Sequence, residues 1–445
     1  MANNPLDVVW ILLCTVLVIM MQPGFVFLET GLTRTKNSIS VAIKNLADFC
    51  IVGTIFGILG FGLMYGESIN GFVGSTQFLF EAGPNSFDHA YMLFQLSFCA
   101  TAVTIISGAV AERIRFTGYL IVAFITASFI YPIVGHWIWA GHDHSVSKGW
   151  LEALGFIDFA GASVVHVVGG SAALAAIIVI GPRLGRFDEN QTGSFQGENL
   201  TYATAGTFLL IMGWFGFIGG SLLASDALLP VVFLNTIVAA AFGGAATTAL
   251  SWFREPQPNI IHIMVGILAG LVAITGSCST VSTLNAAIIG VVAGGLSLLG
   301  TFILEKLKID DAVGAVPVHL FPGVWGTLAV SLFSNSDSFI QGYSRWDQLF
   351  VQLTGAIVTV AYSFGVMLLL LRLVDRFVPL RVSADIERIG LNAGEHGATS
   401  EVYILAEKMR TQSCENNFTN RVDINPHSDI GALQLEYNRV LDAVQ

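Results

Sequence analysis

Long apolar runs cover most of this chain, and they restrict its fold more than any other feature. A helix that crosses a bilayer needs about 20 mostly apolar residues. Runs of about that length occur eleven times, at roughly residues 7–30, 40–65, 90–110, 117–140, 157–180, 201–222, 228–252, 260–277, 284–304, 312–334 and 347–375. We therefore predict an all-α integral membrane protein with eleven transmembrane helices, embedded in a lipid bilayer.

The composition supports this class and excludes others. The chain is 54% hydrophobic and 11% charged, with a mean hydropathy of +0.70, whereas a soluble domain carries roughly 25% charged residues. The formal charge of −11 lies largely in the polar tail and loops, so it does not indicate a nucleic-acid partner. The five cysteines are scattered without metal-ligand spacing. The N-terminus lacks a basic region before its first apolar run, so that run is expected to remain as a helix.

The loops between the apolar runs predict the orientation. One alternating set is rich in basic residues, whereas the other carries only Lys148 and Arg345. The positive-inside rule places the basic set in the cytoplasm. With an odd number of spans, we expect the N-terminus outside, the C-terminus in the cytoplasm, and the protein in the plasma (inner) membrane.

A nine-residue pattern, D-x-x-G-A-x-x-V-H, occurs twice. The first copy runs from Asp158 to His166 and the second from Asp311 to His319, with every matching position offset by 153 residues. The copies fall in spans five and ten, so spans one to five and six to ten are predicted to be equivalent halves. An odd number of spans per half gives the halves opposite orientations, which is the inverted-repeat pattern of many transporters. Span eleven stands outside the repeat and leads into the tail.

The two histidines are the first candidates for chemistry. A single histidine in a membrane span is often satisfied by one helix–helix hydrogen bond, but a pseudo-two-fold axis would bring His166 and His319 together near the bilayer centre. Two neutral imidazoles can share a proton and line a narrow path for a small polar solute. A metal site is not expected, because no third ligand lies near them in the sequence.

Several segments together resemble the ammonium transporter family, the Amt/Mep/Rh group. They are the paired histidines, Asp158-Phe-Ala-Gly161, Phe94-Gln-Leu-Ser-Phe98, Ala111-Glu-Arg-Ile-Arg-Phe116, Gly213-Trp-Phe-Gly-Phe217 and Gly390-Leu-Asn-Ala-Gly-Glu-His-Gly397. The resemblance extends over residues 1 to about 400. It implies eleven helices per subunit, a homotrimer and one pore in each subunit.

The resemblance also implies roles for individual residues. His166 and His319 resemble the twin pore histidines, and Phe98 and Phe217 resemble the phenylalanines that close the pore on its outer side. The outer recruitment site for ammonium is implied at Phe94, Trp139 and Ser221. Aromatic faces attract cations by about 0.5–2 kcal/mol, and a serine hydroxyl can accept a hydrogen bond from an N–H donor. Without the resemblance, each aromatic would be interpreted as packing.

Asp158 has two interpretations, because it can coordinate the cation directly or cap the start of span five. Three departures from the family pattern also bear on the pore. Ile218 follows Phe217 where the family often has Asn, and Gly314 stands where several relatives have an acid. Residues 141–148 resemble an insertion beside Trp139 whose two histidines form either a weak metal-binding pair or a solvated loop.

The chain is predicted to consist of a membrane domain at residues 1–380, a cytoplasmic tail at 381–410, and a linker with the start of a signalling coiled coil at 411–445. Residues 381–397 resemble the tail that in this family meets a PII-class regulatory protein. Ile430, Leu433, Tyr437, Val440 and Val444 then follow at heptad spacing. This segment is interpreted either as a helix docked on its own subunit or as a coiled coil leading to a fused kinase or cyclase output domain. In the second case, residues 430–445 are expected to be frayed in this chain.

Two functions are consistent with these features. The first is a transporter that passes ammonium, as ammonia with a separately handled proton, through the twin-histidine pore. The second is an ammonium receptor with little or no flux that signals through its tail. An amine or gas channel of the Rh branch fits less well, because the Phe98, Phe217 and Trp139 set is intact. No nucleophile–base or metal constellation indicates an enzyme, and no cofactor is expected.

Overall fold

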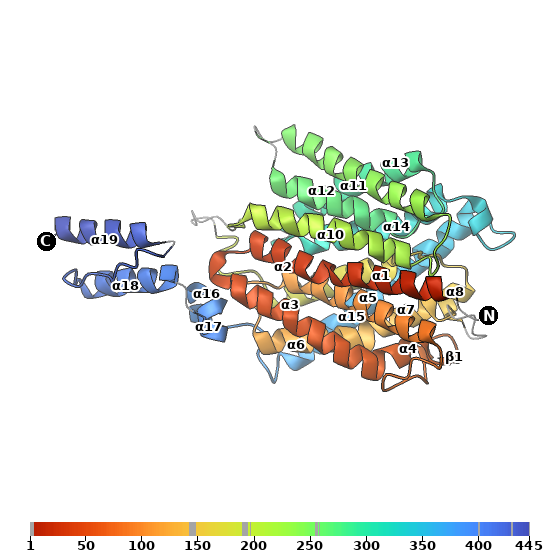
Figure 1. Ribbon diagram of the computed structural model, residues 1–445, viewed down its shortest axis with the longest axis horizontal. Coiled ribbons are helices and arrows are strands. Elements are labelled where there is room, and N and C mark those ends of the chain that lie inside the picture. The colour runs from red at the N-terminus through yellow and green to blue at the C-terminus, as the bar shows by residue number, and fades with distance from the viewer. Residues whose placement is uncertain are drawn as a thin grey trace.

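The computed structural model describes residues 4–141, 148–188, 195, 197–253, 257, 259–398, 401–428 and 430–444. Long helices run side by side in one bundle, with the N-terminus near one end and the tail helices projecting beyond the other (Figure 1). We call the end that carries the tail the inner end and the opposite end the outer end. The two chain termini therefore lie at opposite ends of the bundle.

Five spans form the first half of the bundle. The first, second, fourth and fifth each consist of consecutive helical segments. In order, the elements are α1 (Pro5–Ile19) with α2 (Met21–Leu32), α3 (Thr35–Ile55) with η1 (Phe56–Gly60) and α4 (Phe61–Tyr65), α5 (Ser86–Ala109), α6 (Phe116–Ile125) with η2 (Thr126–Ile130) and α7 (Tyr131–Trp139), and η3 (Ala162–Val167) with α9 (Val168–Ile180).

Six further spans follow as single helices. They are α10 (Leu200–Gly220), α11 (Leu229–Trp252), α12 (Ile260–Ile274), α13 (Thr283–Lys306), α14 (Ala315–Phe333) and α15 (Arg345–Val374). Short elements complete the outer end: the antiparallel pair β1 (Ser68–Ile69) and β2 (Val73–Gly74), the helix α8 (Trp150–Ala153) and the turn η4 (Ser336–Ser338). The tail contains α16 (Ala384–Ile389), α17 (Leu391–His396), α18 (Glu401–Glu415) and α19 (Gly431–Val444).

All eleven apolar runs are helical, which confirms the predicted fold class. Among the described residues, ten of the helical segments are long and apolar enough to cross a membrane, and α12 is an apolar helix of 15 residues. The fifth span begins later than the apolar run that starts near residue 157. Gly161 stands just before it at φ 104°, in the left-handed region that a side chain would strain.

Spans five and ten cross through a reciprocal contact. A Cβ added to Gly170 would lie 2.7 Å from the backbone nitrogen of Leu320, and one added to Gly323 would lie 3.3 Å from that of Val167. Gly323 and Leu320 each follow their counterparts, Gly170 and Val167, by the same 153 residues as the repeat. Small residues let membrane helices approach this closely, and the symmetry of the contact fits two equivalent halves.

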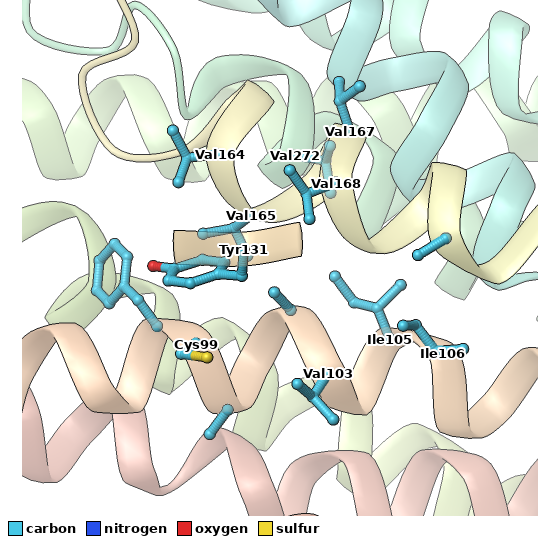
Figure 2. Packing of buried hydrophobic residues seen from close by; sticks show 14 of the residues in the cluster. Cys99, Val103, Ile105, Ile106, Tyr131, Val164, Val165, Val167, Val168 and Val272 are labelled. Atoms are coloured by element: carbon cyan, nitrogen blue, oxygen red, sulfur yellow. The ribbon is translucent and has the colours of Figure 1, made fainter. Parts of the chain in front are cut away.

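Apolar side chains fill the space beside this crossing. Figure 2 shows valines of η3 and the start of α9 facing side chains of α5, with Tyr131 of α7 and Val272 of α12 nearby. The labelled residues have exposures of 1% or less: Cys99, Val103, Ile105, Ile106, Tyr131, Val164, Val165, Val167, Val168 and Val272. Close packing of this kind holds the backbone of the fifth span rigidly in place.

The first part of the tail docks on the inner ends of the membrane helices. The backbone N–H of Leu391 donates to Asn37 Oδ1 at 2.9 Å, and the N–H of Ser40 donates to Asn392 Oδ1 at 3.0 Å. The N–H of Phe116 donates to Glu395 Oε2 at 2.8 Å. These bonds tie α17 to the start of α3 and of α6.

The last two helices form a hairpin beyond the membrane domain. Residues 411–415, expected in a linker, are instead the last turn of α18. Residues 431–444, expected to be frayed, form the continuous helix α19. Polar bonds hold α19 in place: Tyr437 Oη donates to Gln412 Oε1 at 2.6 Å, and Asn438 Nδ2 donates to the Val422 carbonyl at 2.9 Å.

The face that α19 uses for this docking largely differs from the heptad seam, although the seam residue Tyr437 takes part in it. Leu441 is 2% exposed and Gln434 is 8% exposed, whereas the seam residues Leu433 and Val440 are 53% and 57% exposed. The helix therefore docks on its own chain while leaving part of the seam uncovered.

Candidate functional site

The two histidines of the repeat meet in the middle of the bundle. His166 on η3 and His319 on α14 are both buried, and their Nδ1 atoms lie 3.1 Å apart. In a hydrogen bond of this length one Nδ1 donates and the other accepts, so the pair holds a single proton between the rings. His166 Nε2 has no hydrogen-bond partner within the described ranges. The pair can therefore offer a ring nitrogen to a passing polar molecule.

The aspartates of the repeat explain how both histidine helices begin. The carboxylate of Asp158 accepts four backbone N–H groups, from residues 161 to 164, at 2.7–3.0 Å. Asp311 accepts the N–H groups of Gly314 at 2.9 Å and Val316 at 2.7 Å. Gly314, like Gly161, has a positive φ, here 82°. Because four donors occupy the Asp158 carboxylate, the geometry favours the capping interpretation over direct contact with a cation.

Two stacked phenylalanines lie beside the histidine pair, on the side of His166. The rings of Phe98 on α5 and Phe217 on α10 are stacked, with centroids 3.9 Å apart and planes 3° apart. The Phe217 ring lies 5.8 Å from the His166 ring. Both phenylalanines are almost fully buried. No room for a hydrated ion remains between rings at this separation.

The expected recruitment residues gather around this stack. The ring centroids of Phe94 and Trp139 lie 4.6 Å and 6.2 Å from that of Phe98. Trp139 Nε1 donates to the Asp158 carbonyl at 2.8 Å, and Ser221 Oγ donates to the Phe217 carbonyl at 2.9 Å. The structure thus brings all the residues singled out in the sequence into one column.

The structure describes two of the three departures from the family pattern. Ile218 is fully buried on α10, and Gly314 lines a cavity beneath His319. His142 and His144, the two histidines of the apparent insertion, lie outside the described residues. Trp139 keeps its place beside Phe98 next to that segment.

A cavity and a vestibule continue the column toward the inner end. A small cavity of about 30 Å³ is lined by His319, Glu29, Val313 and Gly314. The vestibule, of about 500 Å³, shares several lining residues with it and adds Arg183, Arg186 and Asp311. The two hollows therefore adjoin each other.

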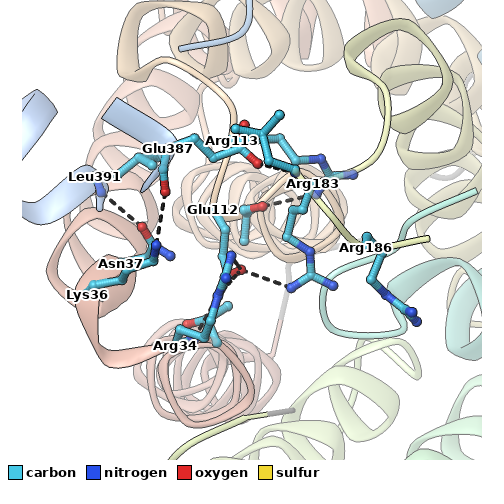
Figure 3. A network of polar contacts seen from close by, with 12 residues as sticks. Arg34, Lys36, Asn37, Glu112, Arg113, Arg183, Arg186, Glu387 and Leu391 are labelled. Carbon is cyan, nitrogen blue, oxygen red and sulfur yellow. Dashed lines mark hydrogen bonds and ion pairs between the residues drawn. The ribbon is translucent and has the colours of Figure 1, made fainter. Parts of the chain in front are cut away.

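A buried ion network surrounds the vestibule at the inner end (Figure 3). Glu112 accepts hydrogen bonds from Arg34 Nε at 2.9 Å and from Arg183 Nη1 at 3.0 Å, and Arg183 Nε donates to Asp310 Oδ2 at 2.7 Å. Burial acts to raise the pKa of Glu112, but the charge of Arg183 and the bonds from Arg34 outweigh it and lower the pKa to about 2. Burial also acts to raise the pKa of Asp310, but the hydrogen bonds and the charge of Arg183 outweigh it and lower the pKa to about 2.

The network also reaches the tail. Glu387 of α16 accepts the backbone N–H of Leu184 at 2.6 Å and pairs with Arg381 at 2.8 Å. The loop that lines the vestibule is therefore bonded directly to the tail.

Sequence reasoning missed several residues near the path. Trp214 stacks on His166 with centroids 5.2 Å apart, and its Nε1 donates to Thr275 Oγ1 at 3.1 Å. Glu29, Lys44 and Asp48 are buried inside the first two spans. A signal for these three was present, since an ionisable residue within an apolar run is a functional candidate by default.

Comparison with known proteins identifies the family. The sequence pattern of the Ammonium Transporter Family matches residues 9–401. A protein of Synechocystis sp. that carries an ammonium transporter name is 42% identical over 99% of this chain and 82% of its own length. The ammonium transporter Amt2 of Archaeoglobus fulgidus is 40% identical over 89% of this chain and 88% of its own. A solved structure named Sensor Amt Protein has a TM-score of 0.85 at 40% identity, and the match covers 88% of this chain and 98% of that one.

The family match at residues 9–401 includes nearly the whole bundle, both histidine helices and the docked part of the tail. They support ammonium transport by an integral membrane protein, in a family of transporters and channels rather than enzymes. The chain belongs to the ammonium transporter family.

Proposed function

We propose that this protein recruits ammonium at an outer aromatic site and passes it through the pore lined by His166 and His319, as ammonia with a separately handled proton. The observation that carries the proposal is the 3.1 Å contact between the two Nδ1 atoms, made by residues 153 positions apart. It lies directly behind the stacked Phe98 and Phe217 and ahead of the inner cavity that His319 lines.

The outer site is suited to a small cation. Phe94, Phe98 and Trp139 present aromatic rings, whose negative faces attract ammonium. The Ser221 hydroxyl donates its proton to the Phe217 carbonyl, so its oxygen lone pairs remain able to accept an N–H from the cation. The same site would hold a larger hydrated cation less well, because the rings replace water only for an ion that sheds its shell.

Beyond the stack, the chemistry favours a neutral species. Moving a bare cation into this dry interior costs far more than moving ammonia, because nothing there compensates the lost hydration. Ammonia can instead donate an N–H to a ring nitrogen of the histidine pair. The proton would then move separately, and its first acceptor would be the histidine pair.

Three features of the assembly complete the proposal. The family resemblance implies a homotrimer with one pore per subunit. The basic residues around the inner vestibule support a cytoplasmic inner end, which places the N-terminus outside in the plasma membrane. The docked residues 384–396 would form the platform for a PII-class regulator.

The test is the current evoked by ammonium in proteoliposomes containing the wild type, His166→Ala or His319→Ala. Both variants should lose at least nine-tenths of the current while still sedimenting and eluting as the wild type does. His136→Gln is a matched control, because His136 is equally buried but bonds to Met64 and Ser68 away from the pore. Unchanged ammonium currents in both alanine variants would refute the twin-histidine pore.

A second function, an ammonium receptor, is favoured by one specific match. The Sensor Amt Protein superimposes over nearly its whole length. The α18–α19 hairpin, with Leu433 and Val440 exposed, would offer a surface through which occupancy of the pore could reach a signalling output. The two functions differ in flux: a receptor would bind ammonium with the affinity of the outer site and show no ammonium current in the same proteoliposomes.

A further inference from the structure

Three ionisable side chains lie buried inside the first two spans. Glu29 of α2 is 2% exposed, and Lys44 and Asp48 of α3 are both fully buried. Glu29 Oε2 accepts hydrogen bonds from Asn45 Nδ2 and Ser107 Oγ, each at 2.9 Å. This group, which we call the buried charge cluster, has no part in the outer site or the histidine pair.

Neighbouring residues link the members of the cluster, and Tyr119 contacts two of them. Glu29 is bonded to Asn45, the residue that follows Lys44 on α3. Lys44 Nζ lies 5.7 Å from the ring centroid of Tyr119. Tyr119 Oη in turn donates to Asp48 Oδ2 at 2.5 Å. Lys44 Nζ and Asp48 Oδ1 have no hydrogen-bond partner within the residues that the structure describes. The cluster therefore keeps spare donor and acceptor capacity although it is buried.

Glu29 connects this cluster to the pore. It lines the same cavity of about 30 Å³ as His319. A cavity needs roughly 10–15 Å³ by this measure to hold a water molecule, so there is room for one or two between the carboxylate and the imidazole. A proton can cross such a gap through water. On its inner side the cavity shares Leu32 and Val313 with the vestibule.

The charges of the cluster leave it one proton short of neutrality. With Glu29 and Asp48 ionised and Lys44 protonated, its net charge is −1, and uptake of one proton makes it neutral. A buried net charge is unfavourable in a dry interior, so the cluster has a reason to take up a proton. Arg113 and Glu112 act on Lys44 from the inner loop with opposite signs, and the titratable and charged groups that line the adjoining vestibule are Arg183, Arg186, Asp188, His262, Glu305 and Asp311.

We propose that Glu29, supported by Lys44 and Asp48, is the group that receives and releases the permeating proton on the inner side of the histidine pair. The inference rests on the proposed passage of ammonia and a proton past His166 and His319. Ammonium divides into ammonia and a proton at the outer side. The proton moves from the histidine pair through the cavity to the Glu29 carboxylate, forms the neutral acid, and leaves through the vestibule to recombine with ammonia.

The first test measures this protonation directly in the reconstituted protein. Infrared difference spectra recorded on addition of ammonium should show the stretch of a newly protonated carboxyl group in the wild type. The band should be absent in Glu29→Gln, which keeps the shape of the side chain but cannot titrate, and should reappear at a shifted frequency in Glu29→Asp. Glu67→Gln, which changes an exposed carboxyl at the outer end, is the control and should keep the band.

The second test measures transport. Glu29→Gln should lower the ammonium-evoked current at least tenfold, while the ammonium concentration at half-maximal binding stays within twofold of the wild type. A wild type without the carboxyl band, or a Glu29→Gln variant that keeps both band and current, overturns the assignment.

The two levels of the argument fail in different ways. If His319→Ala abolishes the current and Glu29→Gln does not, the pore stands and the role of Glu29 falls. If neither histidine variant alters an existing current, the proposed pore itself falls. If the wild type passes no current, the infrared band alone decides whether Glu29 takes up a proton when ammonium binds.

Discussion

Replacing Glu112 with glutamine should destabilise the inner end of the membrane domain strongly. The Glu112 side chain is fully buried and accepts bonds from Arg34 and from Arg183, which is itself 2% exposed. Glutamine fills the same space but carries no charge. The Glu112→Gln variant would therefore leave two guanidinium groups at the vestibule with only Asp310 to balance them.

The magnitude follows from the proton affinity of Glu112. Its pKa is lowered from 4.5 to about 2, and each pKa unit corresponds to about 1.36 kcal/mol. The charged form is thus favoured by about 3 kcal/mol relative to the unfolded chain. Breaking a buried ion pair by removing one partner costs roughly 3–5 kcal/mol. Both arguments predict a loss of about 3 kcal/mol in the free energy of unfolding at pH 7.

The assay is unfolding in mixed detergent micelles, followed by tryptophan fluorescence as the denaturing detergent is increased. Glu305→Gln is the matched control, because it removes a carboxylate that pairs with Arg186 in the same region but is 47% exposed. An exposed pair contributes about 0–1 kcal/mol. If Glu112→Gln is destabilised no more than Glu305→Gln, the network does not hold the inner end together and this reasoning is wrong.

Three further predictions use the same structure. Because the folded-state pKa values of Glu112 and Asp310 are both lowered to about 2, their stabilisation is complete above about pH 4.5 and should be lost as the pH falls toward 2; an unfolding series over this range that shows no decline contradicts the network. Trp139→Leu should raise the half-saturating ammonium concentration roughly 2- to 30-fold, from a loss of about 0.5–2 kcal/mol of cation–π attraction, and an unchanged concentration dependence would remove Trp139 from the recruitment site. Leu433→Glu should leave the α18–α19 hairpin resistant to limited proteolysis because Leu433 is exposed, whereas Leu441→Glu should expose it to cleavage; equal sensitivity would mean that α19 docks by a different face.

The membrane helices could be predicted because the signal for each lies within its own segment. About 20 apolar residues form a helix in lipid whatever surrounds them, since no other local structure satisfies the backbone there. The repeat from Asp158 to His166 and from Asp311 to His319 was also visible, together with the order of the halves. The structure differs from the prediction at the start of the fifth span, where Gly161 and the Asp158 cap delay the helix beyond the expected residue 157.

The tail shows where a local pattern is insufficient. Heptad spacing predicted a helix near residues 430–445, where the structure has α19, but the spacing does not predict which side of that helix packs on the rest of the tail. The bonds from Tyr437 to Gln412 and from Asn438 to Val422 turn Gln434 and Leu441 toward the rest of the tail. A helix of 14 residues gains most of its stability from its contacts, and apart from Tyr437 the residues that make these contacts, Gln434, Asn438 and Leu441, lie outside the heptad seam.

The sequence by itself determined the class of fold, the number of spans and the inverted halves, and it singled out the residues that the structure gathers around His166 and His319. Only the tertiary structure decided that the rings of Phe98 and Phe217 stack at 3.9 Å, that the histidines meet at 3.1 Å, and that Glu29 shares a cavity with His319. The physical reason is that the two kinds of feature depend on interactions between residues at different separations along the chain. Helix formation in lipid depends on neighbours along the chain, whereas a shared proton, a closed gate or a buried charge depends on distances of a few ångströms between helices far apart in sequence, which packing alone sets.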